Sequence, residues 1–573
     1  MAEQADGAVD GAAAPTGGED AADTCSAYQL LSKARQLVPS ALEQARRSKG
    51  FTARWKTVES KIEHLPECLS DLSSHPCFSR NDIFREQLQS VCRTLTEVIE
   101  LSRRHGDGDE QPCIGKLQMQ STLDSLSGKL DLNLKDCRLL MKTGVLEEYT
   151  LPRTAAPNPA EPDPAHSNVG ELLARLHIGH DEAKHRAVDG LLAAMKEDDK
   201  VVTSALSRSN IAALVHLLMA ASPRIREKAA EVIRMLIELG ICEELLVSEG
   251  VLPPMIRLAE SGSSVSRESA VASLRGLSRS PDTARCIVGH GGVSQLVEMC
   301  QTGDSITQAA AAAALRNLSA VPEVRQPLVE EGIIRVMINL LGCGMVSGCK
   351  EHAAECLQNL TASNDSLRRA VLADDGLRSL LLYLDGPSPP ESAVGALRNL
   401  VGSVPPEMLI SMGLLPRLLH AMWAGSVGAQ QAAASAICKI STSSEMKKSI
   451  GEVGCLPLLI SMLDAKTNGA REVAAQALSS LMSYSQNARE VKKDIRSVPN
   501  LVHLLETSPH NTAKKYAVAC LLRLSTSKRC RKLMISYGAV GYLKKLSEMD
   551  IVGSKRLLER LERGKLRSLF SRR

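Results

Sequence analysis

The sequence predicts an all-α protein in which an N-terminal helical bundle precedes a right-handed superhelix of short helices, an α-solenoid. Three observations support this class. A sequence repeat with a period of about 41 residues runs through the C-terminal two thirds of the chain. Apolar residues follow helical spacing, with no alternating strand pattern. Residues 25–150 also have helical spacing but lie outside the repeat. A chain of 573 residues is also too long for one ordinary core.

Residues 1–24 form an acidic segment that we expect to be disordered. They contain six acidic residues and no basic one, so they lack the charged and apolar regions of a signal peptide. Ala2 after the initiator methionine also excludes N-myristoylation. No run of 18 apolar residues follows, so the sequence predicts no membrane-spanning segment.

Residues 25–150 are predicted to fold as a bundle of four helices. Four amphipathic stretches lie at 27–48, 54–74, 84–104 and 121–146, and a four-helix bundle is the simplest fold that buries their apolar faces. Residues 151–167 contain five prolines, which predicts a stiff, extended linker between the bundle and the repeats.

The repeat is marked by a glycine that precedes an apolar run. Successive steps are 41, 41, 44, 37, 41 and 84 residues, and the last step contains one more unit beginning at Arg496; two earlier units begin at Asn168 and Ser209. The marked positions are Gly250, Gly291, Gly332, Gly376, Gly413, Gly454 and Gly538. About ten units therefore occupy residues 168–573.

Each unit is predicted to contain three helices. In residues 323–363 a short helix ends at Gly332, where glycine can adopt the left-handed conformation that closes helices. A second helix follows, and sister units place a proline near its start, where a missing amide hydrogen is harmless. These prolines are Pro253, Pro416, Pro457 and Pro499. The third helix is longer and contains the repeated pentapeptide ALRNL, at 314–318 and 396–400.

Two motifs, the glycine followed by an apolar run and the pentapeptide ALRNL, resemble those of armadillo repeats, as found in β-catenin, importin-α and the plant armadillo proteins. The resemblance extends over roughly 70% of the chain. The resemblance implies that the third helices line a concave groove that binds an extended protein segment. The bundle followed by repeats is similar to plant proteins related to the U-box ubiquitin ligases. In those ligases a U-box separates the two regions, whereas here 17 linker residues leave no room for one, so ligase activity is not implied.

When the third helices of the repeats are aligned, one equivalent position is polar in every repeat from residue 317 onward, and we call this position the polar column. It contains Asn317, Asn359, Asn399, Lys439, Ser480 and Arg523. By the resemblance, the three asparagines project into the groove, where each amide could pair with the backbone of an extended peptide. We include Glu355, Lys439 and Arg523 in this candidate groove site. The alternative is that the asparagines only satisfy neighbouring backbone groups.

Two further columns accompany the polar one. Three residues earlier lies a small-residue slot, expected in the stacked core: Val232, Ser273, Ala314, Cys356, Ala396, Ala436, Ala477 and Cys520. Immediately before the column lie Arg234, Arg275, Arg316 and Arg398. These arginines could form a basic groove edge that selects an acidic partner, or they could be solvated or pair with the next repeat.

Other functions receive little support from the sequence. Importin-α has tryptophan one turn before its asparagines, where this chain has Ala313, Glu355 and Gly395, so classical nuclear-signal recognition is not expected. Between its charged ends the chain is nearly neutral, and with two Trp and four Phe it offers few stacking platforms for nucleic acid.

No enzyme, cofactor or metal is predicted. The glycine clusters at 289–292 and 342–348 do not follow strands, as phosphate loops require. Cys343, Cys349, His352 and Cys356 resemble a metal cluster, but Cys356 occupies the small core slot. The 16 cysteines are expected to be buried free thiols in a reducing compartment.

The C-terminal residues 551–573 are strongly basic, with eight basic and two acidic groups. The basic residues are Lys555, Arg556, Arg560, Arg563, Lys565, Arg567, Arg572 and Arg573. This segment could be the last third helix, a nuclear-import signal, or a surface for anionic lipids, with Leu557, Leu558, Leu561 and Leu566 on its apolar side.

The sequence therefore predicts a non-enzymatic scaffold that binds partner proteins through extended segments. The alternative is an accessory that recruits substrates to a separate ubiquitin ligase. No nucleic acid or small-molecule substrate is expected. We expect the protein in the cytoplasm and nucleus, or peripherally at the inner plasma membrane.

Overall fold

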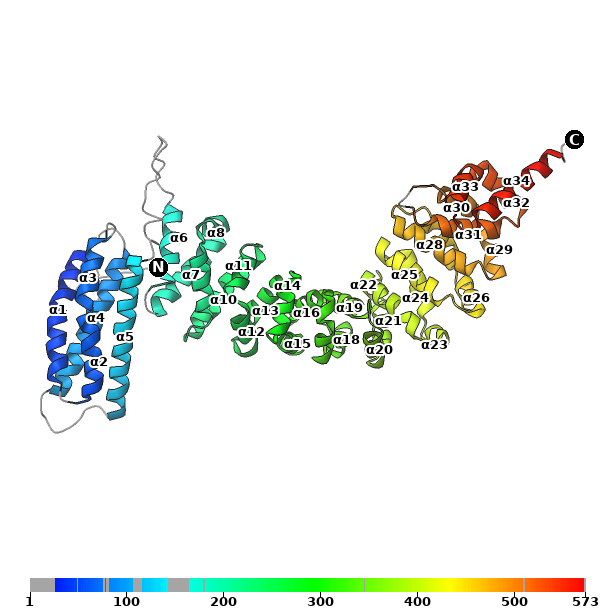
Figure 1. Ribbon diagram of the computed structural model, residues 1–573. Coiled ribbons are helices and arrows are strands. Elements are labelled where there is room, and N and C mark those ends of the chain that lie inside the picture. Colours follow the sequence, from blue (N-terminus) through cyan, green and yellow to red (C-terminus); the bar gives the residue numbers. More distant parts are fainter. Residues whose placement is uncertain are drawn as a thin grey trace, which may run out of the picture. The chain divides into compact units, whose positions relative to one another are not determined.

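The computed structural model describes residues 26–48, 50–75, 78, 82–106, 116–142, 164–178, 181–344, 346–508 and 511–570. Throughout these residues the regular secondary structure is helical, as Figure 1 shows. The chain forms two compact units, residues 1–249 and 250–573. None of the described helices is both long enough and apolar enough to cross a bilayer.

The first unit begins with the predicted bundle. Its helices are α1 (Ala27–Arg47), α2 (Thr52–Glu63), α3 (Leu65–Ser74), α4 (Asp82–Gly106) and α5 (Lys116–Lys142). The second predicted helix is divided at His64, because Pro66 lies in the first turn of α3 and cannot continue the hydrogen bonding of α2. The rods still pack as a four-membered ring, since α1 contacts α2 and α4, and α5 contacts the same two helices (Figure 1).

The bundle core is apolar, with one buried polar network between α4 and α5. Asn133 is 1% exposed; its Oδ1 accepts from Ser90 Oγ (2.9 Å), and its Nδ2 donates to Thr94 Oγ1 (3.0 Å). Buried polar groups are costly unless they are paired, so this network favours one register of the two helices.

The predicted linker is shorter than expected at its C-terminal end. Helix α6 (Pro164–Arg175) begins with four residues that were assigned to the linker, because proline is well tolerated in a first helical turn; residues 151–163 lie outside the described residues. Ala174 and Ile178 belong to the bundle's core, and Arg175 Nη1 pairs with Glu86 at 2.8 Å. The expected boundary at residue 168 is therefore not a break in the packing.

The rest of the first unit continues the helical array. After α6 come α7 (Asp181–Glu197), α8 (Asp199–Ala205), α9 (Arg208–Leu217), α10 (Pro223–Glu238) and α11 (Glu243–Ser248).

The second unit contains successive helical triplets. It begins with α12 (Leu252–Ser261) and α13 (Ser264–Leu277). The next two triplets are α14 (Pro281–Gly289), α15 (Gly292–Thr302) and α16 (Ser305–Ala320), then α17 (Arg325–Glu330), α18 (Ile333–Cys343) and α19 (Ser347–Thr361). Then follow α20 (Asp365–Ala373), α21 (Gly376–Tyr383) and α22 (Glu391–Leu400).

Four more triplets complete the chain. They are α23 (Pro406–Ser411), α24 (Leu414–Ala424) and α25 (Val427–Ile440); α26 (Ser444–Glu452), α27 (Cys455–Met462) and α28 (Asn468–Leu481); α29 (Ser485–Lys493), α30 (Ser497–His503) and α31 (Lys514–Leu524); and α32 (Lys528–Ser536), α33 (Ala539–Glu548) and α34 (Ser554–Phe570). The expectation of three helices per unit is confirmed in this unit, including the basic C-terminal segment as the last third helix.

Gly332 has the predicted left-handed conformation, and most of the other glycines that mark the repeat share it. Gly332 has φ of +80°, and the corresponding residues are also left-handed at Gly250, Gly291, Gly413, Gly454 and Gly538. In the unit marked by Gly376, the preceding residue Asp375 takes the left-handed position with φ of 62°. Gly376 is needed for space instead: a Cβ there would lie 2.5 Å from the Val371 side chain.

The small-residue slot lies in the core, as predicted. All eight positions are at most 2% exposed. Each slot residue belongs to a third helix, and in the second unit these helices pack on one another in the order α13, α16, α19, α22, α25, α28, α31, α34. Small side chains allow that close approach.

Candidate functional site

The candidate site is the row of third helices in the second unit, and its most regular feature is a set of hydrogen bonds between consecutive repeats. Asn317 Nδ2 donates to the Arg275 carbonyl oxygen (3.2 Å) and to Ser278 Oγ (2.9 Å). Asn359 Nδ2 repeats the pattern with the Arg316 carbonyl (3.5 Å) and Ser319 Oγ (3.1 Å). Each amide thus closes the end of the preceding third helix.

Asn399 makes the same two contacts in the next repeat. Its Nδ2 donates to the Gln358 carbonyl oxygen (3.1 Å) and to Thr361 Oγ1 (3.2 Å). In all three cases the carbonyl belongs to the residue just before the column in the preceding repeat, and the hydroxyl lies two residues after the column.

Other residue types make related contacts toward the C-terminus, although Ser480 and Arg523 bind the carbonyl two residues after the column. Lys439 Nζ donates to the Arg398 carbonyl (3.0 Å), Ser480 Oγ donates to the Ser441 carbonyl (3.2 Å), and Arg523 Nη1 donates to the Met482 carbonyl (3.5 Å). Arg560 Nη1 then contacts the Leu522 carbonyl (3.3 Å) and Ser525 Oγ (3.2 Å). We call these seven donor residues the donor ladder: Asn317, Asn359, Asn399, Lys439, Ser480, Arg523 and Arg560.

The ladder has a simple chemical requirement. The last carbonyls of a helix lack partners within the helix and carry partial negative charge. Amide, ammonium, hydroxyl and guanidinium groups can all donate to them. Burial, followed by the charges of Arg398 and Arg368, lowers the pKa of Lys439.

The structure corrects one expectation about the asparagines. Their amide N–H groups are not available to a ligand, because both hydrogens of each Nδ2 already have acceptors in the preceding repeat. The remaining group is the carboxamide oxygen. The Oδ1 atoms of Asn317 and Asn399 accept from the arginine just before each (2.8 and 3.2 Å).

The predicted basic edge is not a row of free cations. Arg316 Nη1 pairs with Glu355 of the next repeat at 2.8 Å, which also accounts for Glu355 as a candidate groove residue. Arg398 donates to Asn399, and Arg234, in the first unit, pairs with Glu238 at 2.7 Å. Arg275 supplies the carbonyl that Asn317 binds. Pairing within a repeat or with the next one describes Arg234, Arg316 and Arg398 better than a solvated edge.

The sequence reading missed a second set of donors on the first helices. Arg325 Nε donates to the Ser319 carbonyl (2.8 Å), Arg368 Nε to the Thr361 carbonyl (2.9 Å), and Arg531 Nη1 to the Ser525 carbonyl (2.7 Å). Each arginine follows its acceptor by six or seven residues in the printed sequence. That spacing was a detectable signal.

Carboxylates at the opposite ends of the third helices were also missed. Glu351 accepts from Ser392 Oγ (2.8 Å) and Glu391 from Ser426 Oγ (2.6 Å), each from the next third helix or its cap. Glu472 accepts likewise from Thr512 Oγ1. These glutamates lie eight residues before the ladder positions 359, 399 and 480. Acidic groups near helix starts and donors near helix ends both suit the helix dipole.

The basic tail is partly used in packing. Leu557 and Leu561 are fully buried, as the alternative of a last third helix requires, so these two leucines do not form an exposed apolar face. Lys555 pairs with Asp550 at 2.9 Å, Arg563 approaches Glu559 at 3.9 Å, and Arg556 is exposed. The side chains of Lys565, Leu566 and Arg567, and residues Arg572 and Arg573, lie outside the described residues.

The cysteines near residue 350 differ in burial, since Cys349 and Cys356 are buried and Cys343 is exposed. Within the described residues no three His, Cys, Asp or Glu side chains are arranged to hold an ion. Burial raises the pKa of the Cys356 thiol to about 12, as expected for a thiol in the packed core.

Comparisons with known families match two parts of the chain. Residues 280–320 match the model described as Armadillo/beta-catenin-like repeat. Residues 32–145, within the helical bundle, match a model described as Domain of unknown function (DUF7032). No curated protein matches the sequence significantly.

Among solved structures, an engineered protein from the Northeast Structural Genomics Consortium aligns with a TM-score of 0.58 and 22% identity, covering 69% of this chain and 98% of that one. A designed armadillo repeat protein aligns at 0.38 and 23% identity, and another, in complex with peptide (KR)4, at 0.37 and 24%; each covers 40% of this chain and 99% of its own. The chain is an all-α protein with an α-solenoid, in which residues 280–320, the helices α14 to α16, match the armadillo repeat model.

Proposed function

We propose that this protein is a non-enzymatic scaffold that binds an extended segment of a partner protein along the third helices of its second unit. The observation that carries the proposal is the register of those helices. They stack in order, and consecutive repeats present a half-exposed polar residue before the ladder position: Arg316, Gln358 and Arg398. An extended chain running across the repeats would meet chemically similar groups at each step.

The groups available to such a segment differ from those the sequence suggested. Because the amide hydrogens of the ladder asparagines are engaged, a ligand backbone would meet the carboxamide oxygens, which accept from backbone N–H groups. Arg316 and Arg398 already donate to two of these oxygens and would turn toward carbonyls or carboxylates of the partner.

The test uses two neutralised pairs of arginines in the full chain. R316Q/R398Q alters the third-helix surface, while R335Q/R378Q alters two exposed arginines on the second helices α18 and α21. Proximity labelling in cells identifies the partners of each. We expect R316Q/R398Q to lose partners that the control keeps, with little change in melting temperature. An unchanged partner set in both variants would contradict the proposal.

The same labelling addresses the ligase alternative. If ubiquitin-ligase subunits dominate the partners that depend on Arg316 and Arg398, the protein recruits substrates to a separate ligase. If ligase subunits are absent from that set, the alternative fails while the scaffold proposal remains.

We also propose a cytoplasmic and nuclear location, with charge-driven contact to anionic membranes as the alternative. Because Leu557 and Leu561 are buried in the array, any membrane contact of the tail would depend on its basic side chains. Imaging of the tagged chain, with Arg563, Lys565, Arg567, Arg572 and Arg573 either intact or neutralised, separates these locations.

A further inference from the structure

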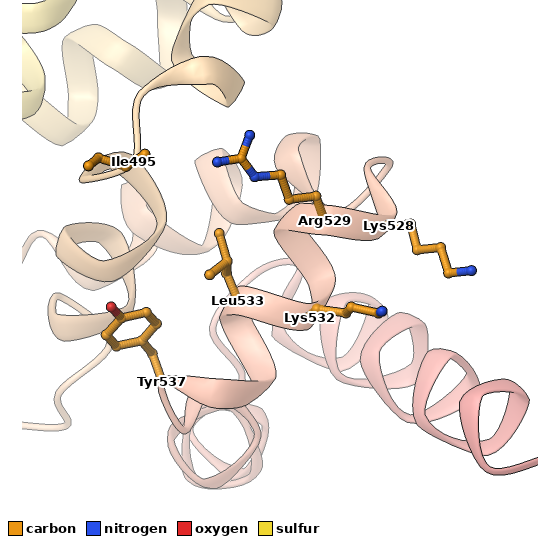
Figure 2. Close-up of a pocket in the computed structure, with 6 residues that line it drawn as sticks. All are labelled: Ile495, Lys528, Arg529, Lys532, Leu533 and Tyr537. Atoms are coloured by element: carbon orange, nitrogen blue, oxygen red, sulfur yellow. The ribbon is translucent and has the colours of Figure 1, made fainter. Parts of the chain in front are cut away.

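A second surface, separate from the third helices, lies on the first helix of the last repeat. A cavity of about 680 Å³ is lined by three cations and three apolar or aromatic residues: Lys528, Arg529, Lys532, Ile495, Leu533 and Tyr537. Figure 2 shows this cavity between α32 and the turn that precedes α30. A cavity of this size is within the range of ligand sites.

The side chains divide into two groups that match helical spacing. Arg529 and Leu533, one turn apart on α32, extend toward the side where Ile495 and Tyr537 lie (Figure 2). Lys528 and Lys532, also one turn apart, project on the other side. The cavity therefore has an apolar wall with a guanidinium above it, and a pair of ammonium groups beside it.

Folding does not explain these three cations. No side-chain hydrogen bond or ion pair joins Lys528, Arg529 or Lys532 to any other residue that the structure describes, whereas two cations near the cavity are paired. Lys493 meets Glu490 at 2.9 Å and Arg496 meets Asp494 at 3.2 Å. Two of the three also lie in the first turn of α32, which contains no acidic residue, although helix starts favour acidic groups.

The apolar residues are also unusually open. Ile495 is 70% exposed and Tyr537 is 53% exposed. Isolated exposed apolar residues are ordinary, but here they share a cavity with unpaired cations. The surrounding sequence has the same bias, since residues 485–547 contain thirteen Lys and Arg against three Asp and Glu.

We propose that this cavity binds an acidic segment of a partner protein that inserts one apolar side chain. Carboxylates of the segment would pair with Lys528, Arg529 and Lys532, and an aliphatic or aromatic side chain would fill the wall formed by Ile495, Leu533 and Tyr537. Because the three charged residues are cations, charge complementarity requires a negatively charged partner. The concave shape favours a peptide over a bilayer, which needs protruding apolar groups, and a single tyrosine gives little platform for nucleic-acid bases.

The experiment selects peptides from a random twelve-residue display library on the full-length chain. Selected peptides are then measured against the charge-reversed variant K528E/R529E/K532E and the apolar variant I495S/Y537S. A matched control, K466E/K544E/K545E, changes net charge equally at three exposed lysines outside the cavity. Circular dichroism and melting verify that each variant is folded.

We expect a class of acidic peptides with a shared apolar position. Their affinity should fall about tenfold or more in K528E/R529E/K532E and several-fold in I495S/Y537S, but less than about twofold in the control. Selection of no acidic class, or equal loss in the cavity and control variants, would overturn the proposal.

Phosphatidylserine vesicles and a single-stranded oligonucleotide serve as competing probes. If either binds through the three cations while no selected peptide does, the cavity is a lipid or nucleic-acid surface and the peptide proposal is wrong. The third-helix variant R316Q/R398Q should bind the selected peptides normally, because this cavity is independent of the proposed groove.

Discussion

At the scale of single residues, the recurring asparagine of ALRNL is a hydrogen-bond donor for the preceding repeat. Position 359 has Asn, position 439 has Lys and position 523 has Arg, yet each donates to a carbonyl near the end of the neighbouring third helix. A buried amide without partners would be costly. Here its nitrogen is satisfied, so the polar residue is compatible with the stacked core.

This requirement predicts an order of stability for three variants of Asn359. N359A removes two donated hydrogen bonds, each worth about 0.5–1.5 kcal/mol net. N359D should be less stable than N359A, because a carboxylate cannot donate and would face the Arg316 carbonyl and a helix C-terminus. N359K should recover much of the loss, as Lys439 does in its own repeat.

Urea unfolding at pH 7 measures this order. Gln358, the neighbouring residue, provides a control: Q358A keeps the Gln358 backbone carbonyl that accepts from Asn399 and should lose less than N359A. Equal stability of N359A, N359D and wild type would show that the ladder contributes nothing measurable.

The polar column could be found in the sequence, but the direction in which its asparagine side chains point could not. Periodicity assigns Asn317, Asn359 and Asn399 to one side of the third helices, beside a small slot that is buried as predicted. Whether an amide turns toward the groove or the preceding helix depends on the position of a carbonyl about 40 residues earlier, which spacing alone does not give. The hydroxyls at Ser278, Ser319 and Thr361 were the available clue.

At the scale of helices, local sequence signals predicted the presence of each helix better than the residues at which it begins and ends. The prolines marked second helices correctly, but Pro164 was assigned to a linker although it begins α6. Proline is common both in extended linkers and in first helical turns, so composition could not separate the two. The apolar side of α34 was similarly ambiguous, because a leucine stripe suits a membrane or the adjacent repeat; Leu557 and Leu561 pack into the array.

We predict that L561A loosens the last repeat without unfolding the others. Removing a fully buried leucine costs about 2–5 kcal/mol, and α34 packs against α31, α32 and α33. Hydrogen exchange should become faster in residues 528–563 and stay unchanged before α28, because repeat arrays are stabilised by nearest neighbours. L558A is the matched control, since Leu558 is only half-buried. Equal effects of the two variants would contradict this packing.

At the scale of the second unit, repeats are interchangeable only if their register is kept. The donor ladder defines that register through contacts between repeats, whereas the glycines define it through backbone conformation, and in one repeat Asp375 rather than Gly376 takes the left-handed position. The seven ladder positions are 42, 40, 40, 41, 43 and 37 residues apart. A deletion from one ladder asparagine to the next should therefore preserve the contacts between the helices that become neighbours.

Deleting residues 318–359 tests this register. The new junction joins Asn317 to Leu360, so Thr361 follows Asn317 by two positions, as Ser319 does in the intact chain. Asn317 keeps its acceptors on α13, and Asn399 finds the Arg316 carbonyl in place of that of Gln358, together with Thr361 Oγ1. We expect a folded array with unchanged helicity per residue and a smaller dependence of unfolding free energy on urea, because less surface is exposed on unfolding.

Deleting residues 318–338 is the control, because it removes half of that interval. It joins Asn317 to the middle of α18, eliminates α17, and leaves a second helix without its left-handed start at Gly332. Apolar faces would then meet polar ones, and nearest-neighbour stacking would be interrupted on both sides. Circular dichroism and cooperative melting should be lost or strongly reduced relative to the full-interval deletion. If the two deletions melted alike, the ladder would not define the repeat, and the stacking of the second unit would tolerate a shift of half a repeat.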